Sequence, residues 1–297
     1  MLPSISHRWY REQSIVWLVS ILMLMIPGCE LFDDPVEIPA YITIEEIDLV
    51  NNPDLSEGSL SNYIVDAWVY VDDQLIGAFE LPATFPVLHR GDKEVAVYAG
   101  VFLNGVRATR VYYPFYAPSV HQVRLTPDSI TTITPVVKYD SRIKMPLHES
   151  FELGGVLFED GPHSLAELTK TDLSGEVFEG NYSGKVELNK TDSMFHVISV
   201  QSYILPSAGG NVFLELDYKT EAPVMVGLYA NKPGQVARLD VAGVLPNDEW
   251  NKVYINLTPI VFRNNDALDF RIYFTSYLPE DQKEAAVLFD NIKLIHF

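Results

Sequence analysis

From residue 41 onward, apolar and polar residues alternate mostly with a period of two, and glycine, proline, asparagine and aspartate interrupt the alternation at short intervals. A period of two puts successive side chains on opposite faces of a β-strand, whereas an amphipathic helix needs a period near 3.6. Tyrosine and phenylalanine, which favour strands, occur 16 and 15 times. The pattern therefore predicts an all-β protein of short antiparallel strands joined by tight turns.

Residues 41–142 predict a small antiparallel sandwich of the immunoglobulin or transthyretin type. Asn104-Gly105 is the best hairpin signal, because a type I′ turn needs positive φ at both central residues. Asp72-Asp73 predicts a second tight turn. The expected strands are 41–47, 63–71, 75–81, 94–103, 106–113, 121–125 and 130–139. The region resembles PEGA-like and carboxypeptidase-regulatory-like modules at residues 69–77, 81–82 and 91–97.

Residues 140–150 contain Pro146 and break the alternation, so we place a domain boundary there, before a longer-stranded second sandwich at 149–297. Only 164–170 has a helical pattern. The expected strands are 177–178, 183–188, 195–199, 211–219, 224–229, 235–242, 252–257, 268–275 and 286–296. The region resembles jelly-roll domains of the galactose-binding and carbohydrate-binding-module kind at residues 151–152, 179–185, 248–257 and 288–294.

The first 28 residues have the organisation of an export signal, with a basic start and an apolar run over 15–26. The run is shorter than the roughly 20 residues that a membrane-spanning helix needs. Cys29 follows it and is the only cysteine, so no disulfide within the chain is possible. Residues 25–29 resemble the lipobox of bacterial lipoproteins, which implies lipidation and cleavage at Cys29. The alternative is an ordinary secretory signal followed by a free cysteine.

Residues 29–40 form a short acidic tether, which resembles the surface-export signals of Bacteroidota lipoproteins or serves only as a solvated linker. We therefore expect an outer-membrane protein, lipid-anchored on the periplasmic or the surface-exposed face. The formal net charge of −19 argues against nucleic acid as a partner, because binding to a phosphate backbone depends on lysine and arginine. The same charge is repelled by anionic lipid headgroups, so the lipid must hold the protein on the membrane.

Catalytic and metal motifs are missing from the sequence. Its seven histidines are scattered, and it has no zinc-binding pattern, nucleophile elbow or phosphate loop. We therefore expect a protein that is not an enzyme, with no certain cofactor. The jelly-roll resemblance implies a structural Ca²⁺ between the first and last strands, held by Glu152 and Asp290, with Glu176 and Asn181 as further ligands. The alternative is that these side chains only cap turns or face solvent.

Aromatic residues near expected loops and strand ends are candidate platforms for stacking sugar rings. These candidates are Tyr203, Tyr229, Trp250, Phe262 and Tyr277, although Trp250 has packing as an alternative role. A second aromatic group, at 112–118, is dense enough for a protein-binding surface or for packing over the end of the sandwich. Its members are Tyr112, Tyr113, Phe115 and Tyr116.

Taken together, the sequence predicts a lipid-anchored binding protein of the cell envelope. The first hypothesis is that the jelly roll binds a glycan or mediates adhesion at the cell surface. The alternative hypothesis is a non-catalytic structural or accessory subunit of an outer-membrane assembly, in which the 112–118 segment contacts an envelope protein. Fold class alone does not separate the two, because jelly rolls have many unrelated roles.

Overall fold

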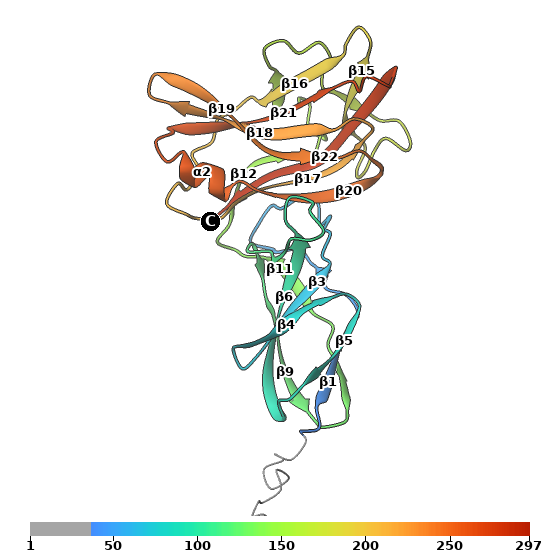
Figure 1. The fold of residues 1–297 in the computed structure, drawn as a ribbon, viewed down its shortest axis with the longest axis vertical. Coiled ribbons are helices and arrows are strands. Elements are labelled where there is room, and N and C mark those ends of the chain that lie inside the picture. The colour runs from blue at the N-terminus through green and yellow to red at the C-terminus, as the bar shows by residue number, and fades with distance from the viewer. Residues whose placement is uncertain (1–36) are drawn as a thin grey trace, which may run out of the picture. The chain divides into compact units, whose positions relative to one another are not determined.

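A computed structural model describes residues 37–297 of the chain. The expected signal at 1–28, most of the acidic tether and the lipidation site Cys29 lie outside the described residues. Residues Ala40–Phe297 form one compact unit. In this part the secondary structure is almost entirely β, with α2 (Thr258–Arg263) as its one helix, which confirms the predicted fold class (Figure 1). No helix among the described residues is long and apolar enough to cross a membrane.

The strands before residue 140 form three sheets, which we call the N-terminal sandwich. One has the order β4-β3-β6-β7 with β9 paired to β6, and two short sheets have the orders β10-β1-β5 and β2-β11-β8. The strands are β1 (Ala40–Ile44), β2 (Asp48–Leu49), β3 (Asp66–Val71), β4 (Gln74–Glu80), β5 (Ala83–Val87), β6 (Gly91–Phe102), β7 (Arg110–Tyr112), β8 (Tyr116–Ala117), β9 (Ser119–Leu125), β10 (Ile130–Thr132) and β11 (Val136–Tyr139). Two short pairs, β1 with β10 and β2 with β11, are parallel and not antiparallel as expected.

Both expected tight turns have the backbone conformation that the sequence predicts. Asp72 and Asp73 have φ of 47° and 64°, and Asn104 and Gly105 have φ of 54° and 72°. The strand expected at 106–113 is shorter, however, and begins only at Arg110. The reason is that Leu103 and Val106 each bond to a neighbour within the loop, so residues 104–109 form successive turns.

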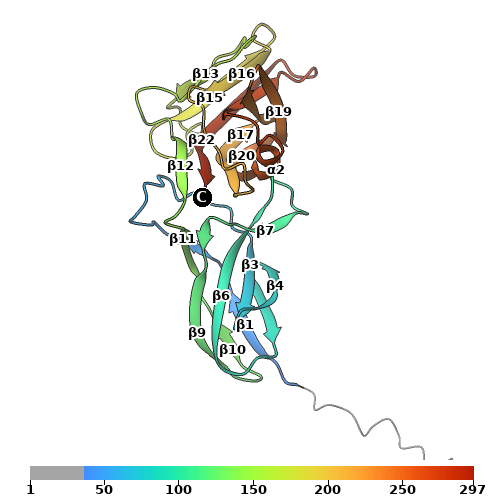
Figure 2. The ribbon, with the colours of Figure 1, turned by 90° about the vertical axis from the view of Figure 1, so that its left-hand side faces the viewer.

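The strands from 144 onward form two facing sheets, the C-terminal sandwich (Figures 1 and 2). They are β12 (Lys144–Glu149), β13 (Phe158–Asp160), β14 (Thr169–Thr171), β15 (Ser183–Asn189), β16 (Met194–Ser199), β17 (Val212–Thr220), β18 (Val224–Lys232), β19 (Gln235–Val244), β20 (Asn247–Asn256), β21 (Asp269–Tyr277) and β22 (Glu284–His296). The order β13-β16-β21-β18-β19 defines the cleft sheet. The order β14-β15-β22-β17-β20, with β12 also paired to β22, defines the covered sheet. The domain boundary proposed at 140–150 stays a prediction.

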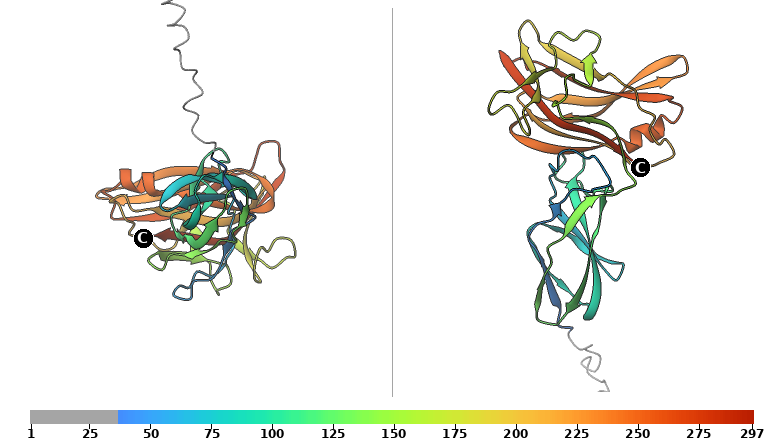
Figure 3. Two further views of the ribbon diagram at one scale, coloured as in Figure 1. Left: turned by 90° about the horizontal axis from the view of Figure 1, so that it is seen from below. Right: turned by 180° about the vertical axis from the view of Figure 1, so that it is seen from behind.

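The helix expected at 164–170 is wrong. The amides of Leu165 and Ala166 both donate to the Met194 carbonyl on β16, so they are not free for helical hydrogen bonds. The helix that does form, α2, begins with a proline in its first turn, a position where the missing amide costs nothing. In the view from behind in Figure 3, the last strand β22 crosses the C-terminal sandwich and ends at the chain terminus.

Each sandwich has its own apolar core. The core between the cleft sheet and the covered sheet includes Phe195, Phe274 and Phe289. The core of the N-terminal sandwich also contains three residues from the covered sheet, namely Phe213, Tyr254 and Ile295. One face of the covered sheet therefore packs on its partner sheet and the other packs on the N-terminal sandwich, whereas the cleft sheet packs on one face only.

Candidate functional site

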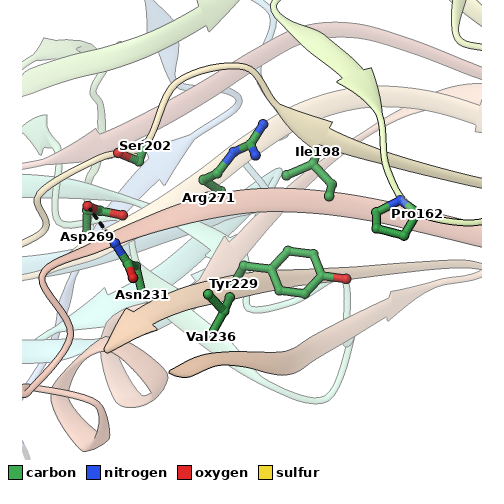
Figure 4. A pocket seen from close by; sticks show the side chains of 8 residues that line it. All are labelled: Pro162, Ile198, Ser202, Tyr229, Asn231, Val236, Asp269 and Arg271. Atoms are coloured by element: carbon green, nitrogen blue, oxygen red, sulfur yellow. Dashed lines mark hydrogen bonds between the residues drawn. The ribbon is translucent and has the colours of Figure 1, made fainter. Parts of the chain in front are cut away.

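A cleft of about 540 Å³ lies on the outer face of the cleft sheet (Figure 4). Along β21 the odd-numbered residues Asp269 and Arg271 line it, while the even-numbered Phe270 and Ile272 are buried in the core. This is the alternation that a strand requires. The cleft is lined by Pro162, Ile198, Ser202, Tyr229, Asn231, Val236, Asp269 and Arg271.

Tyr229 is the aromatic residue that lines the cleft. Tyr229 on β18 is half-buried, and its hydroxyl lies 3.0 Å from His196 Nε2 on β16. The Tyr229 ring centre lies 5.1 Å from that of Tyr273, which is fully buried beneath it. Val236 on β19 is 64% exposed beside Tyr229 and extends the apolar surface (Figure 4). A half-exposed aromatic ring with a fixed hydroxyl is thus presented to the cleft.

The Tyr273 ring packs over Gly227, which is its partner residue on the neighbouring strand β18. A Cβ atom at residue 227 would come within 2.3 Å of the Tyr273 ring and hydroxyl, so any larger residue would push the ring out of place. The Tyr273 hydroxyl donates to Asp240, and the Arg238 guanidinium lies 4.8 Å from the Tyr273 ring centre. Burial, followed by the hydrogen bond to Asp240, raises the pKa of Tyr273 to about 12. The hydroxyl therefore stays protonated at neutral pH.

Charged and amide side chains complete the cleft, and each is held by a neighbour. The Arg271 Nε donates to the Ser199 carbonyl at 2.6 Å, and its Nη2 lies 2.5 Å from Glu159 Oε1. Asn231 Nδ2 donates to Asp269 Oδ2 at 3.4 Å, as the dashed line in Figure 4 shows. Such an arrangement offers a ligand both donors and acceptors at fixed positions, next to an apolar ring.

Sequence reasoning found only Tyr229 among the residues that line this cleft. It missed Arg271, Asn231 and Asp269 because only aromatic residues were considered as candidates for sugar binding. The available signal was a polar residue at every second position within an apolar strand, as in Asp269-Phe270-Arg271-Ile272-Tyr273. A strand buried on both faces would instead be apolar throughout.

The other four expected platforms lie elsewhere. Tyr203 is buried and pairs with Phe270 in an isolated bridge, so it is not a platform. Phe262 on α2 and Tyr277 at the end of β21 are exposed but do not line the cleft. Trp250 is half-buried on β20 in the covered sheet.

The expected calcium ligands have protein partners of their own. Glu152 accepts from Asn181, and Glu176 lies 2.7 Å from Lys185 Nζ. Asp290 is buried and accepts from Ser183 at 2.6 Å. Across residues 37–297, no group of three or more histidine, cysteine or acidic side chains is placed to hold a metal ion. The Ca²⁺ site stays a prediction that these contacts do not support.

The expected protein-binding segment is mostly internal. Tyr113, Phe115 and Tyr116 are buried, so the expectation of an exposed surface is wrong for these three and the packing alternative holds. Only Tyr112 is exposed, at 45%. The Tyr113 ring centre lies 5.5 Å from that of Phe213 on β17, so the segment packs against the covered sheet.

The covered sheet carries a buried polar group under the N-terminal sandwich, which we call the junction cluster: Glu215, Asp217, Lys252 and Lys293, all at most 5% exposed. Glu215 accepts from the Tyr113 hydroxyl at 2.6 Å and from the Tyr139 hydroxyl at 2.9 Å. Lys293 Nζ donates to the Ser59 carbonyl at 2.6 Å. Burial lowers the pKa of Lys293 to about 8 and raises the pKa of Asp217.

No protein-family model and no curated protein matches the chain. Among solved structures, a xylan-binding domain is 17% identical, with a TM-score of 0.34 over 50% of this chain and 93% of that one. A family 11 carbohydrate-binding module from Clostridium thermocellum, in complex with a β-1,3-1,4-mixed-linked tetrasaccharide, is 18% identical, with a TM-score of 0.33 over 51% and 94%. The enzymatically active domain of bacteriophage CBA120 tailspike protein 4 is 9% identical, with a TM-score of 0.36 over 47% of this chain but only 19% of its own. Carbohydrate-binding modules with jelly-roll folds are thus among the structural neighbours of about half the chain.

Proposed function

We propose that the chain binds a glycan in the cleft on the outer face of the cleft sheet. The observation that carries this proposal is the cleft itself, in which the ring of Tyr229 adjoins a fixed set of donors and acceptors from Asn231, Asp269 and Arg271. Small-molecule sites usually combine an apolar lining with a few placed polar groups, in volumes of about 300–1,000 Å³. The volume of about 540 Å³ is within this range.

In the proposed complex, the C–H face of a sugar ring lies against Tyr229 and Val236. The hydroxyls on the ring edge replace the weak Asn231 to Asp269 contact, which at 3.4 Å is the longest polar contact described here for the cleft. Arg271 is already oriented by Glu159 and by the Ser199 carbonyl, so little of its side-chain freedom is lost on binding. Binding therefore uses groups that are preorganised in the free protein.

We propose binding without turnover. Glycoside hydrolysis needs two carboxyl groups that flank the scissile bond and can give or take a proton. Asp269 is the one acidic residue among the described residues that line the cleft, while the nearby Glu159 pairs with Arg271 and Asp240 accepts from Tyr273. In the proposed complex, the carboxylate of Asp269 accepts hydrogen bonds from sugar hydroxyls.

A glycan array, followed by titration calorimetry with the best ligand, tests the cleft. We expect Tyr229→Ala to weaken binding at least tenfold, because it removes the stacking surface. Tyr112→Ala, which removes an exposed tyrosine of the N-terminal sandwich, serves as the matched control and should bind as the wild type does. Equal affinity of the wild type and Tyr229→Ala would contradict the proposed site.

We further propose that the protein is anchored in the outer membrane by lipid on Cys29. The lipobox-like sequence 25–29 after an apolar run supports this proposal. Cys29→Ala should move the protein from the membrane fraction to the soluble fraction, and globomycin should block processing of the wild type. A wild-type protein found only in the soluble fraction would contradict the anchor.

A further inference from the structure

A second, smaller pocket lies away from the cleft, against β20 of the covered sheet. It encloses about 320 Å³ and is lined by residues 61–63, Arg107, Phe178 and part of β20 and β17. A narrow extension of about 50 Å³ shares Tyr63, Arg107 and Lys252 with it. The volume is at the lower end of the range for small-molecule sites, which suits a single sugar residue.

Its buried polar atoms without a hydrogen bond are donors. Lys252 is 5% exposed, and its Nζ makes no hydrogen bond, although it lies 3.3 Å from Glu215 Oε2 and 3.6 Å from Asp217 Oδ2. Trp250 Nε1 is buried and also has no partner in the described part of the chain. A buried donor without an acceptor is costly, so Trp250 Nε1 favours a ligand that brings an oxygen acceptor. Lys252 Nζ, which has two carboxylates nearby but no hydrogen bond, can donate to the same ligand.

Arg107 adds a positive charge at the rim. It is exposed, and no ion pair involves its guanidinium within residues 37–297. Asp217 is the one acidic residue in the lining, and its two oxygens already accept from Ser61 at 2.7 Å and from Asn291 at 3.1 Å. In a protein of net charge −19, a concave site with a free arginine and a lysine that lacks a hydrogen bond selects for an anion.

Aromatic and amide groups in the same pocket favour an anion carried on a sugar ring. Phe178 is 38% exposed, and its ring centre lies 5.2 Å from that of Trp250. Asn62, Asn247 and Asn251 also line the pocket, and such amides bond to sugar hydroxyls as donors and as acceptors.

We propose that this pocket binds a uronic acid residue. Its carboxylate meets Arg107 and Lys252, and its ring lies against Phe178 and Trp250. The pocket is separate from the cleft for which we proposed glycan binding. The pocket and the cleft share no lining residue. A glycan with acidic sugar residues would therefore have a second contact on the same chain.

The test is titration calorimetry of the full chain with digalacturonate and with the matched neutral disaccharide of galactose. We expect the acidic disaccharide to bind at least tenfold more tightly, and added salt to weaken it. Arg107→Gln should weaken its binding at least tenfold, and Trp250→Phe, which keeps a ring but removes the N–H donor, should weaken it severalfold. Arg124→Gln, at an exposed arginine of β9, is the matched control and should bind as the wild type does.

Tyr229→Ala separates the two sites. If it leaves digalacturonate binding intact while Arg107→Gln removes it, the pocket is confirmed whether or not the cleft binds a glycan. If Tyr229→Ala removes the binding and Arg107→Gln does not, the acidic sugar occupies the cleft and this inference is overturned while the proposed function stands. Equal affinity for the two disaccharides, or no binding of digalacturonate, also overturns it.

Discussion

The outer faces of the two sheets in the C-terminal sandwich are built alike and used differently. Both carry charged residues and aromatic rings at alternate positions of long strands, as Arg271 and Tyr273 on one sheet and Phe213 and Glu215 on the other show. On the cleft sheet Arg271, together with Tyr229, lines the cleft of about 540 Å³. On the covered sheet these residues are buried under the N-terminal sandwich, and Glu215 accepts from the hydroxyls of Tyr113 and Tyr139.

The comparison shows that alternation marks a face as polar but not as a binding surface. A charged group that stays in contact with water keeps much of its solvation, whereas a buried one must be paired within the protein. The covered face should therefore govern stability and the open face should govern affinity. Three variants test this division of roles.

The largest effect is expected at Glu215. Glu215→Ala leaves the hydroxyls of Tyr113 and Tyr139 without their acceptor in a buried site, and it removes one of the two carboxylates beside the Lys252 ammonium. Loss of one partner from a buried ionic group lowers the free energy of unfolding by about 3–5 kcal/mol, and urea unfolding measures this change. Glu187→Ala removes a carboxylate from an ion pair with Lys185 in which Glu187 is 73% exposed, and should cost less than about 1 kcal/mol. Similar losses of unfolding free energy in Glu215→Ala and Glu187→Ala would contradict the conclusion that the covered face governs stability.

A smaller, pH-dependent effect is expected at His148 on β12, beside the junction cluster. Burial, together with the charges of Lys293 and Lys252, lowers the pKa of His148 from 6.5 to about 4. Between these values the unfolded chain binds the proton and the folded chain does not, so stability falls as the pH falls from 6.5 towards 4.

His148→Gln removes this titration while keeping a polar side chain of similar reach. Between pH 7 and pH 4.5, the wild type should lose about 2 kcal/mol more of its unfolding free energy than His148→Gln does. Urea unfolding of both proteins across this range measures the difference. Parallel pH profiles of the two proteins would show that folding does not lower the pKa of His148.

The smallest change in free energy is expected on the open face. Arg271→Met keeps the length of the side chain but removes the guanidinium that lines the cleft. Glycan affinity should fall about tenfold, which corresponds to about 1.4 kcal/mol. Unfolding free energy should change by about 1 kcal/mol or less, because the ion pair with Glu159 is partly exposed. A large loss of stability with unchanged affinity would reverse the assigned roles of the two faces.

Strand content and tight turns were predictable from the sequence because they depend on local patterns. The alternation along 211–219 and 268–275 reflects strand geometry, and Asn104-Gly105 and Asp72-Asp73 accept positive φ without help from the rest of the fold. The expected helix failed because its amides bond to a strand almost 30 residues away, which no local pattern records.

The candidate site was much less predictable. Tyr229 was found because aromatic residues near strand ends are candidate platforms, but Arg271 and Asp269 meet it only through the pairing of β18 with β21. Burial of Tyr113 and Phe115 likewise follows from contact with Phe213, about 100 residues away in the chain. Which strands become neighbours is set by long-range packing, and a single sequence does not state it.

The turn at Asn104 has one more consequence, which concerns contacts between molecules. β20 is the last strand of its sheet, and an unpaired edge is a template for strands of other chains. The Asn104 amide donates to the Tyr254 carbonyl at 2.9 Å, and the Asn256 amide donates to the Asn104 side chain at 2.8 Å. The turn thus occupies hydrogen-bonding groups at this end of the edge strand, so a strand of another chain cannot pair with them.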